Sequence, residues 1–209
     1  MAKRRKEKTY SLTAFAWQRL RRNKLALSGI GIIAFSILIS ILGYLITPDK
    51  SPDADTHIDE IGIKRPGFSC NLIRLRKNTD INNQSFIRTM LFGRVNDYEY
   101  HAYKNYWFSG NDILWEEYND GPGIPKIWRY NLADAIYPIN PAFQIKNDTI
   151  NGVMDFYAYG ETRKMHKTVQ ELRQEILGNI YHEKFLLGTD HFGRDLLSRL
   201  MIGTRISLF

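Results

Sequence analysis

The most regular feature of the chain is an apolar run near its start, "LALSGIGIIAFSILISILGYLI". This run covers Leu25–Ile46, which is 22 residues without a charged side chain. As a helix rising about 1.5 Å per residue it would extend about 33 Å, enough to cross the roughly 30 Å hydrocarbon core of a bilayer. A core helix of a soluble domain rarely holds so long an uncharged run. A cleaved signal peptide has an apolar region of only about 7–15 residues and ends in a small-residue cleavage site, which is absent here. We therefore predict an uncleaved transmembrane helix.

The basic residues gather in front of this run. Residues 1–25 contain nine Lys or Arg and one Glu, a net charge of +8, so the remainder of the 209-residue chain carries −1 of the total of +7. Positive charge stays on the cytoplasmic side of a membrane helix, which places residues 1–24 in the cytoplasm and residues 47–187 on the far side. The almost neutral remainder offers no basic face for nucleic acid.

Leu12, Phe15, Ala16 and Leu20 follow helical spacing in the basic segment, and Ser11 could cap such a helix. A basic amphipathic helix of this kind suits the headgroup layer on the cytoplasmic side of the membrane.

Small side chains recur along one face of the predicted span, where another helix could approach closely. They are Gly29, Ser36, Ser40 and Gly43.

Residues 47–187 show mixed α and β patterns, so we predict an extracytoplasmic α+β region. "FSCNLIRLRK", residues 68–77, has the character of a strand. "FQIKNDTINGVMDFYAY" resembles a hairpin in which Asn151 and Gly152 form a tight two-residue turn. A helix should follow, with Thr168 and Glu171 as a capping box and Gly178 at its end. Its apolar stripe would consist of Met165, Val169, Leu172 and Ile176.

The sequence shows no catalytic constellation. Cys70 is the only cysteine, so no disulfide can form within the chain, and the five histidines lack the spacing of metal ligands. Neither a phosphate-binding P-loop nor a serine nucleophile elbow occurs. We therefore expect no enzymatic activity, no metal and no cofactor. Six aromatic side chains fit core packing better than a binding surface. These are Tyr98, Tyr100, Tyr103, Tyr106, Trp107 and Trp115.

A second amphipathic helix is predicted in residues 188–209. Thr189 or Asp190 would cap it, and Asp195 and Arg199 have the i, i+4 spacing of an ion pair. One face would carry Phe192, Leu196, Leu197, Leu200 and Met201, and the other Arg194, Asp195, Ser198 and Arg199. After Gly203 the chain becomes apolar again, as at the beginning of a second span.

Two strings carry a family resemblance. "LGTDHFGRDLLSRLMIGTRISL" closely resembles the signature before the second span in the C-type permease subunit of bacterial peptide and nickel ABC importers, the dipeptide and oligopeptide permease family. "WQRLRRNKLALSGIGIIAF" is similar to the segment that leads into the first span of the same family. The resemblance implies a structural or interface role for the signature residues. These are Gly188, Thr189, Asp190, Gly193, Arg194, Asp195, Ser198, Arg199, Gly203 and Arg205.

The resemblance implies the N-terminal part of a permease subunit in the bacterial inner membrane. Its partners would be a second permease, two cytoplasmic ATPases and an extracytoplasmic substrate-binding protein, and its cargo peptides, nickel or related solutes. The expected organisation is a cytoplasmic segment (1–24), a span (25–46), an unusually long extracytoplasmic insertion (47–187), and a signature helix leading into a truncated second span (188–209). The alternative is an extracytoplasmic binding or sensor domain tethered by one span. A membrane-anchored hydrolase is disfavoured because the catalytic motifs are missing.

Overall fold

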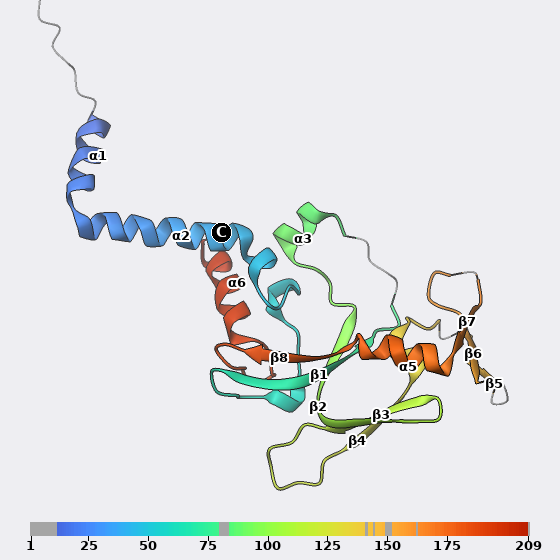
Figure 1. The fold of residues 1–209 in the computed structure, drawn as a ribbon. Coiled ribbons are helices and arrows are strands. Elements are labelled where there is room, and N and C mark those ends of the chain that lie inside the picture. Colours follow the sequence, from blue (N-terminus) through green and yellow to red (C-terminus); the bar gives the residue numbers. More distant parts are fainter. Residues whose placement is uncertain are drawn as a thin grey trace, which may run out of the picture.

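The computed structural model describes residues 12–79, 84–140, 142–143, 145–148, 152–161 and 163–208. Two helices come first, α1 (Leu12–Arg22) and α2 (Lys24–Ile46), and α2 extends away from the rest of the molecule (Figure 1). Asn23 separates them because its side-chain oxygen accepts from the backbone N–H groups of Leu25 and Ala26, at 3.1 and 3.2 Å, and so caps α2.

The two predicted N-terminal helices are both present. Among the described residues, α2 is the one helix that is long and apolar enough to cross a membrane. Helix α1 is amphipathic and carries Arg19, Arg21 and Arg22 in its last turn. The predicted cap, Ser11, lies outside the described residues.

The largest part of the molecule is an antiparallel sheet with the strand order β4-β3-β2-β1-β8. The strands are β1 (Phe68–Arg76), β2 (Tyr98–Ser109), β3 (Asp112–Glu117), β4 (Ile127–Asn131) and β8 (Ile180–Phe185). The strand predicted over residues 68–77 is therefore confirmed as β1.

The sheet-containing region begins with β1 and ends with β8, and we call the place where these two ends meet its base. The first residue of β1, Phe68, pairs with the last residue of β8, Phe185. The chain therefore enters and leaves residues 68–185 at neighbouring points. A region with adjacent ends can be inserted into another structure without separating the segments on either side of it.

A smaller sheet has the order β5-β6-β7. Its strands are β5 (Lys146–Asp148), β6 (Val153–Phe156) and β7 (Met165–Thr168). The predicted hairpin is confirmed by β5 and β6, but the two-residue turn is wrong. Asp148 pairs with Val153, so four residues lie between the paired strands. Gly152, the last of the four, has a φ of +63°, whereas Asn151 lies outside the described residues.

Helix α5 (Val169–Leu177) follows β7 directly. Its capping box is confirmed, because the Thr168 side chain accepts from the Glu171 N–H and the Glu171 side chain accepts from the Thr168 N–H. Gly178 follows the last residue of α5. Met165 does not belong to the helical stripe as predicted, because it lies in β7, ahead of the cap. It packs against the same core as the helix.

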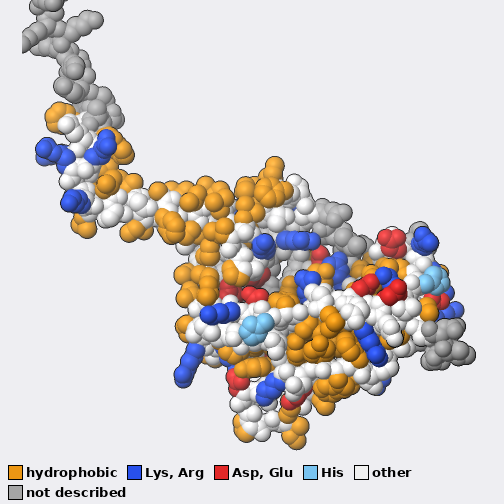
Figure 2. Space-filling view, viewed as in Figure 1, with side chains coloured by type: hydrophobic (Ala, Val, Ile, Leu, Met, Phe, Trp, Pro, Cys, Tyr) orange, Lys and Arg blue, Asp and Glu red, His pale blue; other side chains and the backbone are white. Residues whose placement is uncertain are grey.

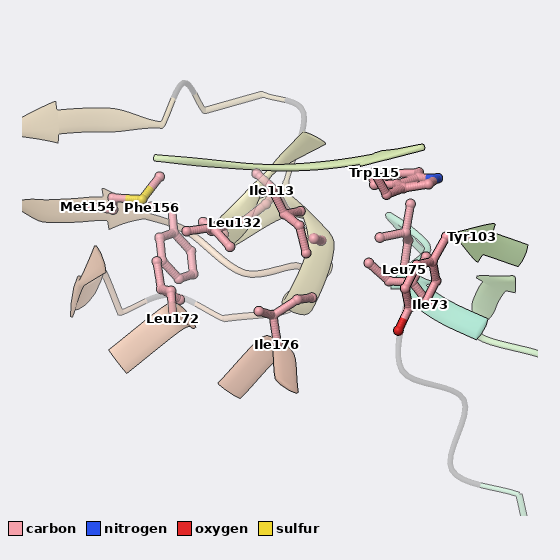
Figure 3. Packing of buried hydrophobic residues seen from close by; sticks show 13 residues of the cluster. Ile73, Leu75, Tyr103, Ile113, Trp115, Leu132, Met154, Phe156, Leu172 and Ile176 are labelled. Atoms are coloured by element: carbon pink, nitrogen blue, oxygen red, sulfur yellow. The ribbon is translucent and has the colours of Figure 1, made fainter. Parts of the chain in front are cut away.

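The main core lies between the large sheet, α5 and the short helix α4 (Leu132–Ile136), with the small sheet at one end (Figure 3). Trp115 is fully buried and Tyr103 nearly so, as core packing requires, whereas Tyr106 and Trp107 are more than a third exposed. Cys70 belongs to a second cluster, and burial raises the pKa of its thiol to about 12.

Helix α6 (Leu196–Leu208) connects the sheet to α2 and ends beside the C-terminal part of α2 (Figure 1). The two helices meet closely because Gly43 has no side chain. A Cβ at Gly43 would lie 3.1 Å from the Ile202 Cδ1 atom. A third helix, α3 (Phe86–Phe92), lies against the same end of α2.

Candidate functional site

The signature residues lie in one loop and in the helix that follows it, α6. Residues 188–195, the signature loop, pack against residues 47–65, which follow α2 and are called here the post-span linker. More than 120 residues of sequence separate the two segments. Together they make the junction, the candidate site, which joins α2, α6 and the base of the large sheet.

Backbone hydrogen bonds hold the two segments of the junction together. The Ile58 N–H donates to the Phe192 carbonyl at 3.1 Å, and the Ile63 N–H donates to the Asp190 carbonyl at 2.8 Å. These bonds join the backbones of the two segments without forming a regular sheet.

Thr189 adds a buried side-chain bridge at the same place. Its hydroxyl donates to the Ile61 carbonyl at 2.5 Å and accepts from the Lys64 N–H at 2.9 Å. Because the side chain is almost completely buried, loss of the hydroxyl would leave both backbone groups without a partner.

Two of the signature glycines are required by close contact with the linker. Gly188 and Gly193 have φ angles of +78° and +69°. A Cβ would lie 2.1 Å from the Lys64 carbonyl oxygen at Gly188, and 1.8 Å from the Ile58 carbonyl oxygen at Gly193. Neither overlap can be relieved by rotating a side chain, since the obstructing atoms belong to the backbone. Gly203, in α6, has open space instead.

Asp190 is the electrostatic centre of the loop. Its Oδ1 atom accepts from the N–H groups of Phe192 and Arg194 at 2.9 and 3.0 Å. Its Oδ2 atom accepts from Arg194 Nε at 2.8 Å and from Arg199 Nη1 at 2.5 Å. Partial burial alone would raise the pKa of Asp190, but these hydrogen bonds outweigh burial and lower the pKa from 3.8 to about 2.

Arg194 connects this centre to the post-span linker. Its guanidinium contacts Asp190 at 2.7 Å and Asp55 at 2.6 Å. The hydrogen bond from Arg194 lowers the pKa of Asp55, and its two acidic partners raise the pKa of Arg194.

The predicted caps of the signature helix are wrong. Helix α6 begins at Leu196, and Asp195 caps it by accepting from the Ser198 N–H at 2.8 Å and the Ser198 hydroxyl at 2.5 Å. Thr189 and Asp190 instead belong to a closed turn, in which Asp190 and Arg194 are joined by a backbone hydrogen bond of 3.1 Å. Positive φ at Gly193 ends any helical path before Asp195.

The predicted ion pair between Asp195 and Arg199 is also absent. Asp195 directs its carboxylate to the helix cap, while Arg199 extends back toward the loop and contacts Asp190. An i, i+4 ion pair needs two exposed positions within a helix, whereas Asp195 is buried and precedes α6 as its cap.

The buried side of α6 differs from the predicted apolar face. Ser198 and Ile202 are buried, whereas Leu196 and Leu200 are 38% and 62% exposed. Ser198 tolerates burial because its hydroxyl donates to Asp195 and accepts from the Asp49 N–H at 3.0 Å.

The small residues of α2 fall into two groups. Ser40 and Gly43 are buried in the part of α2 that meets α6, whereas Gly29 has nothing within 4 Å of the place of a Cβ. Ser36 lies between them and is half-buried.

Arg205 fixes the far end of α6. Its guanidinium lies 5.5 Å from the centre of the Tyr44 ring and donates to the Met90 carbonyl at 3.4 Å. It therefore connects α6 to both α2 and α3.

A cavity of about 450 Å³ is lined by residues of both the junction and the large sheet. Tyr100, Tyr181, Glu183 and Asp195 contribute to its walls. Burial, and next the charge of Asp195, raise the pKa of Glu183. Within the described ranges, no three His, Cys, Asp or Glu side chains are grouped as a metal site would require.

Sequence reasoning missed the linker half of the junction, including Asp49, Asp55 and Ile58. Its one available signal was the acidic stretch "TPDKSPDAD" after the span, opposite in charge to the arginines of the signature.

Comparison with known families finds a match at the N-terminal end of the chain. Residues 11–60 match the family described as the N-terminal TM domain of oligopeptide transport permease C. The matched segment covers α1, α2 and most of the post-span linker. No curated protein and no solved structure matches the chain. The N-terminal part of the chain is thus like that of oligopeptide transport permease C, which supports a permease subunit of an ABC transporter.

Proposed function

Because residues 11–60 are similar to the N-terminal membrane domain of oligopeptide transport permease C, we propose that the chain is the N-terminal part of an inner-membrane permease subunit of a peptide ABC importer. One observation carries the proposal. The family-matched segment includes Ile58 and Glu60, and it is this segment that binds the signature loop through the Ile58 and Phe192 backbone groups.

The junction gives the signature a mechanical role in this proposal. Asp195 begins α6 and Ser198 contacts the linker through Asp49, directly after α2 ends. Gly43 then allows Ile202 to approach α2. The signature thereby sets the angle at which the chain returns from the insertion to the membrane helix.

Residues 68–185 form most of the extracytoplasmic insertion, residues 47–187, in this proposal. Phe68 and Phe185, the first and last residues of residues 68–185, are paired neighbours. The segments before and after the insertion therefore meet at the junction as they would if only a short connection joined them. The insertion would then face the substrate-binding protein, which delivers peptide from that side.

Transport requires partners beyond this span. A single helix in lipid has no surface left to enclose a polar pathway, because each face contacts lipid or protein. A second permease subunit would complete the pathway, and two cytoplasmic ATPases would supply the energy. In the proposed role this chain catalyses no reaction.

A tethered binding or sensor domain is not favoured by the family match. Both the permease and the tethered domain would have residues 1–24 in the cytoplasm and residues 47–187 on the far side of the membrane. A reporter that is active only in the cytoplasm, fused either after Lys24 or after Gly160, tests this topology. Activity is expected at Lys24 alone, because the basic residues precede the span. Activity at Gly160 would overturn the orientation and the permease assignment.

Peptide uptake and co-purification of partner subunits test the permease role itself. In the full-length protein expressed with its partners, Asp195→Ala should impair both, since it removes the cap of α6 and a partner of Ser198. Lys146→Ala is the control, because Lys146 is an exposed residue of β5. Wild-type uptake and co-purification with Asp195→Ala would contradict a role of the junction in transport.

A further inference from the structure

Helix α3 presents an apolar surface that the described parts of the chain leave uncovered. Phe86, Ile87 and Phe92 are each more than 60% exposed, and Leu91 and Val95 are also exposed. We call these five side chains the α3 patch. An apolar cluster on a short helix of an insertion is a mark of an interaction surface.

The position of α3 is fixed against the end of the span. The Arg94 N–H donates to the Lys50 carbonyl at 2.8 Å. At Gly93, a Cβ would lie 2.9 Å from both the Pro52 nitrogen and the Tyr44 Cε1 atom. Tyr44 belongs to the last turn of α2, so α3 lies beside the point where the chain leaves the predicted span.

The apolar surface of α3 lies next to that of α2. Figure 2 shows hydrophobic side chains along the length of α2 and again at the position of α3, beside its end. The α2 residues Ile33, Phe35 and Leu38 are more than half exposed, as expected for a helix that contacts lipid.

The charged side chains of the α3 segment itself, residues 84–96, are all positive. Residues 84–96 contain no Asp or Glu, and Arg88, Arg94 and the neighbouring Lys50 are exposed. Apolar side chains with exposed cations beside them suit the headgroup layer of a membrane with anionic lipids.

From this geometry we propose that the α3 patch inserts into the headgroup and upper acyl layer of the same bilayer that α2 spans. The inference rests on the proposed function, because it takes α2 as the transmembrane helix. A helix of 7 residues is about 10 Å long, too short to cross the membrane but suited to lie in its surface. The α3 patch would give the insertion a second attachment to the membrane, beside the junction.

Spin labels on introduced cysteines test this placement in the full chain, reconstituted in vesicles of phosphatidylethanolamine and phosphatidylglycerol. Cys70 can remain, because it is buried and its raised pKa keeps the thiol unreactive. The test variant is Phe92→Cys. Ile124→Cys is the aqueous control, because Ile124 is 96% exposed on the loop between β3 and β4, and Phe35→Cys is the lipid control within α2.

Collision rates with dissolved oxygen and with a water-soluble nickel chelate report the surroundings of each label. We expect the ratio of oxygen to nickel collisions for Phe92→Cys to exceed that for Ile124→Cys by about tenfold, because oxygen concentrates in lipid and the chelate does not. Equal ratios for these two variants, with a lipid-like ratio for Phe35→Cys, would overturn the proposal for α3 alone. A Phe92→Cys label shielded from both reagents would also overturn it, because protein would then cover the α3 patch. A water-like ratio for Phe35→Cys would instead contradict the span and the proposed function.

Discussion

Replacing Asp190 by Asn removes the charge at the centre of the junction while keeping the size of the side chain. The two oxygens of Asp190 have separate partners, so the substitution is selective. Oδ1 accepts from the N–H groups of Phe192 and Arg194, and the amide oxygen of Asn can continue to do so. Oδ2 accepts from the Arg194 and Arg199 guanidinium groups, and in Asn an NH₂ donor would face these donors.

The magnitude follows from the lowered pKa of Asp190. A shift from 3.8 to about 2 corresponds to about 2 kcal/mol of stabilisation of the folded junction by the ionised carboxylate. Because the folded-state pKa is lowered, this stabilisation is complete above about pH 4 and is lost as the pH falls toward about 2. Asp190→Asn should therefore cost about 2 kcal/mol at neutral pH, and the variant should lack this acid-sensitive step.

Hydrogen exchange of the full chain in detergent micelles measures this loss directly. The reporting amides are those of Ile58 and Ile63, which donate across the junction to Phe192 and to residue 190. If these amides exchange through opening of the junction, 2 kcal/mol corresponds to about 30-fold faster exchange.

Asp155→Asn is the matched control. Asp155 also has two nitrogen partners, Lys164 and His166, at 2.6 Å each, but it lies on β6 away from the junction. Its substitution should leave exchange at Ile58 and Ile63 unchanged. If Asp190→Asn accelerates these amides no more than Asp155→Asn does, the reasoning about the Asp190 centre is refuted.

Three further substitutions, two of them paired with a control substitution, test the junction and its helix contact. Gly193→Ala should prevent formation of the junction and leave the Ile58 amide unprotected, while Gly203→Ala, with open space, should be neutral or stabilising by up to about 1 kcal/mol. Gly43→Leu should separate α2 from α6 and speed hydrogen exchange in α6, whereas Gly29→Leu should not. Equal effects of the two substitutions would exclude a specific contact at Gly43. Ile63 has a φ of +55° and an exposed side chain, so Ile63→Gly should not destabilise the junction and should gain up to about 1 kcal/mol in protection.

Local physical chemistry made several parts of this protein predictable from the sequence. The uncharged run predicted α2 because length and hydropathy alone limit what crosses a bilayer. Thr168 and Glu171 predicted the start of α5, since a capping box is complete within one turn. The strand-like pattern of residues 68–77 predicted β1, because side-chain alternation is a local property of the strand itself.

The arrangement of the signature depended on tertiary structure. Spacing along the chain suggested that Asp195 pairs with Arg199, but Asp195 caps α6 and Arg199 contacts Asp190 instead. Which side of α6 is buried also depends on tertiary contacts, because Ser198 is buried against Asp49, a residue far away in the sequence. A helical pattern identifies an apolar face but not the neighbour that will cover it.

The glycines show the same division most clearly. The sequence displayed Gly188, Gly193 and Gly203 as equal members of one motif. Only the fold distinguishes them, because the post-span linker brings the carbonyl oxygens of Lys64 and Ile58 to within 2.1 and 1.8 Å of the places where the first two would carry a Cβ. Gly203 meets nothing within 4 Å. The sequence by itself thus determined where the membrane helix begins and ends. Contact between two distant segments determined which signature residues hold the junction together, because steric and electrostatic interactions depend on distance in space and not on distance along the chain.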